Sequence, residues 1–114
     1  MKIFIALLCF LFIVASFAYA HPPSDIAITY DPASKILTAV IAHNVSNPAT
    51  HFIRKVDVSM NGKEVINHFI SKQDNNETQT VMYLLPDAKP NDLVSVEAYC
   101  SISGKLEKLI TIPK

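Results

Sequence analysis

The sequence predicts an all-β domain, an antiparallel sandwich of about seven short strands, and two observations support this prediction. Apolar and polar residues alternate with a period of two after residue 25, most strictly over 93–100, where Val94, Val96 and Ala98 share one face. Turn-forming residues interrupt the alternation at short intervals, and no segment keeps a helical periodicity. Regularly spaced short strands of this kind are typical of a sandwich or a small barrel.

The strands follow one another in a single domain without a linker or an internal repeat. Asp31 and Pro32 end the first strand. Asn61 and Gly62 predict a two-residue hairpin turn, because both central residues of a type I′ turn take a positive φ. Further breaks are expected at 74–76, 86–90 and 103–104. The expected strands are 26–30, 36–42, a strand that carries Ile53, Val56 and Val58, then 64–70, 78–84, 93–100 and 106–112.

The first twenty residues read as a secretory signal peptide. Lys2 provides a positive charge, residues 3–17 are almost wholly apolar, and 18–20 (AYA) have the small-x-small pattern of a cleavage site. We therefore expect residues 1–20 to be removed, leaving a secreted or periplasmic domain, 21–114, that begins with His21 and has no membrane segment. An uncleaved N-terminal anchor is the alternative reading of the same apolar run.

Charge and cysteine content narrow the possible functions of residues 21–114. The whole chain has ten basic and ten acidic residues, so the loss of Lys2 leaves a net charge near −1 and no basic stripe for nucleic acid. Cys100 is the one cysteine that remains after Cys9. An unpaired cysteine in an exported domain is a metal ligand, a reactive thiol, half of an intermolecular disulfide or a small buried apolar residue.

Candidate metal ligands lie at the expected strand ends. His43 and His51 flank one loop, Cys100 ends a strand, and His21 is the expected new N-terminus. Imidazole and thiolate together suit iron, copper or zinc. The plainer alternative is that loop histidines are solvated polar residues. His68 lies within a strand and is expected to be a surface or cross-strand residue, and no carboxylate pair indicates acid–base catalysis.

Three segments resemble the superoxide reductases and desulfoferrodoxins, in the order in which that family has them. Residues 43–56 (HNVSNPATHFIRKV) resemble the iron-site loop of the family, His-Pro-Asn-x-x-Glu-His-His-Ile-x-Trp-Ile. Residues 99–104 (YCSISG) resemble Tyr-Cys-Asn-x-His-Gly, and 21–23 (HPP) resemble an early His-x-Pro segment. The resemblance implies an immunoglobulin-like sandwich in which four histidines and an axial cysteine hold ferrous iron that reduces superoxide.

Carried over by position, the resemblance makes His21, His43 and His51 equatorial ligands and Cys100 the axial ligand. Ser103 stands where the family has its fourth histidine. We hypothesise that the terminal amine of His21, freed by cleavage, takes that vacant place. The resemblance implies an exported iron-binding domain, an oxidoreductase if it is active, with a small redox protein as electron donor. Two alternatives stay open: a periplasmic copper-binding or copper chaperone protein with an N-terminal histidine, and an interaction module without a metal.

Overall fold

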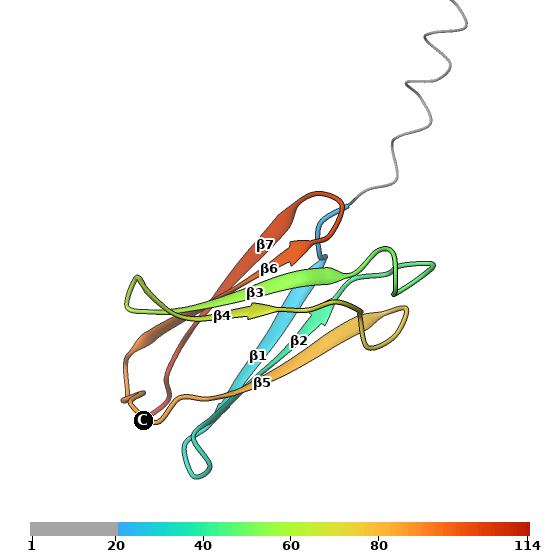
Figure 1. The fold of residues 1–114 in the computed structure, drawn as a ribbon. Helices are drawn as coiled ribbons and strands as arrows, with labels where there is room; N and C mark the ends of the chain where they lie inside the picture. Colours follow the sequence, from blue (N-terminus) through green and yellow to red (C-terminus); the bar gives the residue numbers. More distant parts are fainter. Residues whose placement is uncertain (1–20) are drawn as a thin grey trace, which may run out of the picture.

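A computed structural model describes residues 21–114, which form seven antiparallel strands in two sheets, without helices (Figure 1). The expected signal peptide, 1–20, lies outside the described residues. The structure confirms the predicted all-β, immunoglobulin-like sandwich. The strands are β1 (Asp25–Asp31), β2 (Ile36–Ala42), β3 (Ile53–Met60), β4 (Lys63–Phe69), β5 (Thr78–Leu84), β6 (Leu93–Cys100) and β7 (Lys105–Thr111).

The chain divides the strands between a three-stranded sheet, β1-β2-β5, and a four-stranded sheet, β4-β3-β6-β7. The chain crosses from the first sheet to the second after β2 and returns for β5. β1 and β7 meet along one side of the sandwich, where Lys108 and Asp25 form an ion pair at 3.2 Å. No helix long and apolar enough to cross a membrane occurs within residues 21–114.

The core lies between the sheets and is made of the inward-facing aliphatic rows that the alternation predicted. Leu37, Ile41, Val56, Val58 and Val96 are fully buried. Side chains on the outward faces of the sheets are partly or largely exposed, such as Val40 on β2 and Met82 on β5. Side chains of a strand point alternately to the two faces, so one row of each strand can be apolar while the other faces solvent.

The turn at Asn61 and Gly62 confirms the predicted tight hairpin. Both residues have a positive φ, 52° and 84°, and they alone separate β3 from β4. The other end of β3 is irregular, because its register against β6 shifts between Ile53 and Lys55. This bulge still leaves Ile53 fully buried and paired with Cys100.

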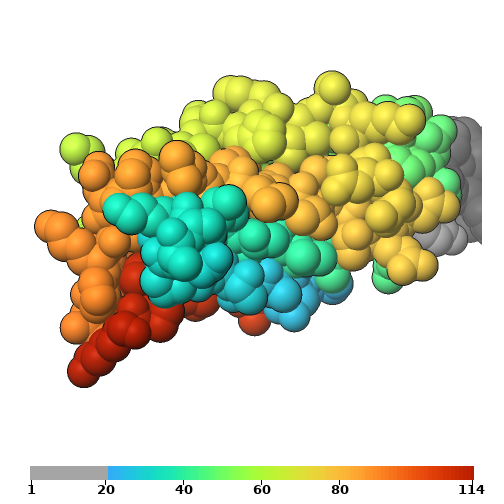
Figure 2. All heavy atoms as spheres, turned by 90° about the horizontal axis from the view of Figure 1, so that it is seen from below, coloured from blue at the N-terminus to red at the C-terminus, as the bar shows by residue number. Residues whose placement is uncertain are grey.

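Two strand pairings decide which loops meet at one end of the sandwich. Asp25 pairs with Ala42, so the chain before β1 lies beside the chain after β2. Ile53 pairs with Cys100, so the chain before β3 lies beside the end of β6. The segment between β4 and β5 is at this same end, whereas the β1–β2 turn, residues 86–92 and the C-terminus are at the opposite end (Figures 1 and 2).

We expect Leu37→Ala to destabilise the domain by about 2–5 kcal/mol, because it removes a fully buried side chain and leaves a cavity. Chemical denaturation measures this loss. The matched control is Met82→Ala on the exposed face, where Met82 is 62% exposed and a change within about 0.5 kcal/mol is expected. Equal losses in the two variants would contradict the assignment of faces.

Candidate metal centre

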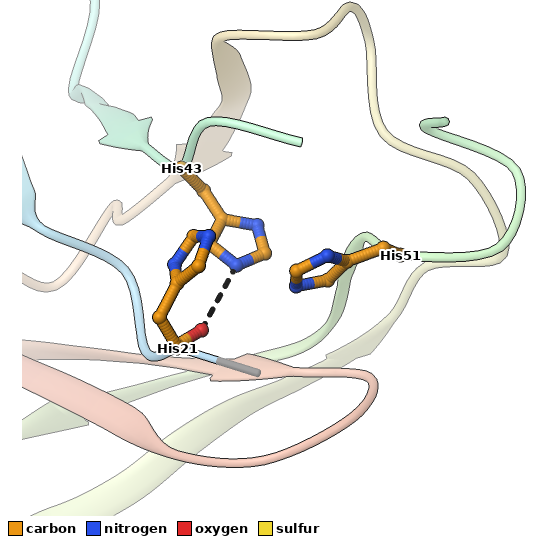
Figure 3. A group of neighbouring side chains, drawn as sticks. All are labelled: His21, His43 and His51. Carbon is orange, nitrogen blue, oxygen red and sulfur yellow. Dashed lines mark hydrogen bonds between the residues drawn. The ribbon is translucent and has the colours of Figure 1, made fainter. Parts of the chain in front are cut away.

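Three histidines from separate parts of the chain converge at the end of the sandwich where the two pairings meet (Figure 3). One nitrogen from each of His21, His43 and His51 can be chosen so that all three lie within 4.8 Å of one another. Their ring centroids are 4.8–5.1 Å apart. The three rings differ in exposure: His43 is buried, His51 is intermediate and His21 is exposed. The cluster is therefore buried on the side of His43 and open to solvent on the side of His21.

His21 is held in the cluster by contacts of the residues that follow it. The Ser24 backbone N–H donates to the Ala42 carbonyl at 2.8 Å, which ties the start of the chain to the end of β2. Pro22 packs against the turn between β6 and β7, where Gly104 has a φ of 87°. A Cβ on Gly104 would lie 2.8 Å from the Pro22 Cβ, so a side chain at this position would push the N-terminal segment away.

His43 is fixed by Gln73, a fully buried side chain of the β4–β5 segment. The Gln73 Oε1 lies 2.8 Å from His43 Nδ1 and also accepts the Ile53 backbone N–H at 3.2 Å. The Gln73 amide nitrogen donates to the carbonyl oxygens of His43 and Asn75, at 2.8 and 3.0 Å. The other ring nitrogen, His43 Nε2, points into the cluster and lies 3.3 Å from the carbonyl oxygen of His21 (Figure 3).

Cys100 adjoins the cluster through His51. Its Sγ is 3.2 Å from His51 Nε2, and the residue is buried and free of a disulfide. The backbone N–H of Ile102 donates to the same sulfur at 3.4 Å. These contacts follow from the Ile53–Cys100 pairing, because His51 lies two residues before the start of β3. The thiol is thus placed beside an imidazole with its sulfur supported by a backbone donor.

The distances suit a small transition-metal ion. Metal–nitrogen bonds of roughly 2.1 Å and a metal–sulfur bond of roughly 2.3 Å at a right angle put nitrogen and sulfur about 3.1 Å apart. The observed His51–Cys100 separation of 3.2 Å agrees with two neighbouring ligands. With the same bond lengths, neighbouring nitrogens at a right angle would be about 3.0 Å apart and opposite nitrogens about 4.2 Å apart. The ligand nitrogens of the three imidazoles, which lie within 4.8 Å of one another, would move inward to bind one ion. The nitrogen and sulfur donors suit iron, copper or zinc rather than magnesium or calcium.

The structure brings together three of the four residues that the sequence predicted as ligands, His21, His43 and His51. Cys100 lies beside this cluster and contacts His51 alone of the three histidines. His68 lies elsewhere: its Nδ1 is 2.7 Å from the hydroxyl of Tyr83, so it links β4 to β5 across the two sheets. Sequence reasoning missed Gln73. Its segment reads as a polar turn, and no local signal distinguishes a buried glutamine there from a solvated one.

Neither the models of known protein families nor the curated proteins searched contain a match to this chain.

In the metal-free protein we expect His51 to titrate below the ordinary histidine value of 6.5. Burial lowers its pKa most, and the neighbouring His43 and His21 lower it further. The unfolded chain therefore binds this proton at a higher pH than the folded domain, so stability should fall as the pH drops through about 6.5. Imidazole shifts in NMR give the pKa, and melting temperatures give the slope. An ordinary or raised His51 pKa would contradict this prediction, as would a pH slope unchanged by His51→Gln.

Gly104→Ala and Gly62→Ala form a matched pair that tests how His21 is positioned. Both glycines have a similar positive φ, 87° and 84°, so each alanine costs about 1–2 kcal/mol in backbone strain. Only the Gly104 variant also collides with Pro22, because a Cβ on Gly62 meets nothing within 4 Å. We expect the Gly104 variant alone to shift the NMR signals of the His21 ring. Identical His21 signals in both variants would show that Pro22 does not position the histidine.

Proposed function

We propose that this protein is an exported metal-binding domain in which His21, His43, His51 and Cys100 hold one first-row transition metal, with iron as the expected ion. Export rests on the signal-peptide pattern of residues 1–20, and the ligand set rests on the geometry of the cluster. The protein carries the site on loops at one end of a rigid sandwich, which is a common way for a β scaffold to support function.

The observation that carries this proposal is the convergence of three imidazoles from separate places in the chain, with a buried thiol beside one of them. The nearest histidines in sequence, His43 and His51, are on either side of a loop, whereas His21 and Cys100 come from opposite ends of the described residues. A purely structural role does not require three imidazoles side by side, because like rings offer one another no complementary charge. A shared cation gives the three nitrogens a common partner.

Iron is the first expectation because the order of the ligands along the chain resembles that of superoxide reductases. If these residues held ferrous iron, it would supply one electron, which with two protons would convert superoxide to hydrogen peroxide. Cys100 would provide the sulfur ligand, to which the Ile102 backbone N–H donates at 3.4 Å. His21 is on the open side of the cluster, where a small anion can approach, and a small redox protein would return the electron there.

Copper binding is the alternative that the exposed position of His21 favours. Cleavage before His21 would free an α-amine next to an imidazole already in the cluster, and the two groups could bind one copper ion together. Such a domain would bind and deliver copper without turnover. The two functions use the same residues but different metals and different spectra.

Metal analysis and a visible spectrum of the processed protein test the site. One bound metal per chain is expected, with a thiolate-to-metal charge-transfer band that Cys100→Ser abolishes. His43→Ala should weaken metal binding by more than about 100-fold, since removing a ligand costs more than removing a group that supports one. His68→Gln is the matched control, because it changes a histidine outside the cluster and should bind metal normally.

The same measurements separate the alternatives. Iron with a ferric charge-transfer band and reduction of superoxide supports the reductase, whereas tight copper binding without turnover supports the carrier. An added residue before His21 tests the amine as a ligand, because it converts the amine to an amide and should weaken binding sharply. Failure of the processed protein to bind iron, copper or zinc would overturn the proposal and favour an interaction module.

A further inference from the structure

Gln73 holds its side-chain amide in one orientation only. Its Nε2 donates to two carbonyl oxygens, of His43 and Asn75, while its Oε1 accepts the backbone N–H of Ile53. Turning the amide over would place an oxygen against two carbonyl oxygens and an NH₂ group against an N–H. Gln73 is only 1% exposed, so water cannot compensate for these mismatches. The oxygen therefore faces His43 Nδ1.

The orientation of Gln73 decides where His43 carries its proton. An amide oxygen can only accept, and it lies 2.8 Å from His43 Nδ1, so this nitrogen must donate. A neutral imidazole has one N–H, and Nε2 is then left with a bare lone pair. The competing partner of Nε2 is the His21 carbonyl oxygen at 3.3 Å, a longer contact than the one to Gln73. The closer and more constrained contact determines the tautomer.

We propose that Gln73 is the positioning residue of the metal centre: it locks the neutral ring of His43 as the Nδ1–H tautomer and presents Nε2 as a ready ligand. The purpose of this arrangement rests on the proposed metal-binding function. The position of the proton does not, because it follows from hydrogen bonds within the protein. A partner that fixes the tautomer and ring orientation of a ligating histidine commonly changes metal affinity by 10–100-fold.

The locked tautomer also affects the N-terminal segment. His43 Nε2 and the His21 carbonyl oxygen, 3.3 Å apart, both present lone pairs to each other in the metal-free protein. Two acceptors at this distance repel, and a cation bound to Nε2 removes the repulsion. Metal binding should therefore draw His21 into the cluster, whereas in the metal-free protein His21 should be the most weakly held of the three histidines.

Long-range ¹H–¹⁵N NMR of the metal-free, purified exported protein tests the tautomer directly. In the neutral ring of His43 we expect the proton on Nδ1 and none on Nε2. Gln73→Leu removes the acceptor and should move the proton to Nε2, which can then donate to the His21 carbonyl oxygen. Gln79→Leu is the control, since Gln79 is also buried but bonds Asp74 rather than His43.

Titration with Co²⁺ measures the consequence for binding. Gln73→Leu should lower Co²⁺ affinity by about 10–100-fold, with Gln79→Leu much less affected. A wild-type His43 whose neutral ring carries its proton on Nε2 would overturn the inference, even if Gln73→Leu did not fold. Unchanged tautomer and affinity in Gln73→Leu would overturn it while leaving metal binding intact. The expected tautomer in a protein that binds no metal would instead refute the proposed function alone.

Discussion

The register of the strands is the constraint on which the rest of this domain depends. Each strand must turn its aliphatic row inward, and a slip of one residue would expose that whole row. Burial of Val56 opposite Ala98 and of Val58 opposite Val96 sets β3 against β6. The same register then places Ile53 beside Cys100, with His51 just outside the sheet. Packing in the middle of the sandwich thereby determines which polar side chains meet at its end.

The candidate centre combines a fixed part with a loosely held part. His43 is buried and has its ring set by Gln73, a glutamine that also bonds the first residue of β3. His21 is exposed and depends on the packing of Pro22 against Gly104. This division suits a site that must be preorganised and yet accessible, because the buried ligand defines the geometry while the exposed one lies at the entrance.

Most of the fold could be predicted from local patterns, whereas the site could be predicted only in part. Period-two alternation and the Asn61-Gly62 turn are local signals, and the structure confirms both. The sequence pattern alone also places His43 and His51 at the two ends of one loop. Their convergence with His21 depends on the order of strands in two sheets, which no local pattern contains. Gln73 was missed because its function arises from contacts with residues 30 and 20 positions away in sequence. The kind of metal, inferred from the resemblance, stays a prediction.

Cys100 also has a consequence for how the domain can be cross-linked. It is free of a disulfide in residues 21–114, so the covalent bridge that stabilises many exported domains is not formed within this part of the chain. A cation shared by His21 and Cys100 would close a loop around nearly all the strands and tie one sheet to the other. Closing so long a loop restricts the unfolded chain in the same way as a disulfide does. The metal would then act as a reversible cross-link, and loss of the ion would leave the sandwich more open to proteolysis.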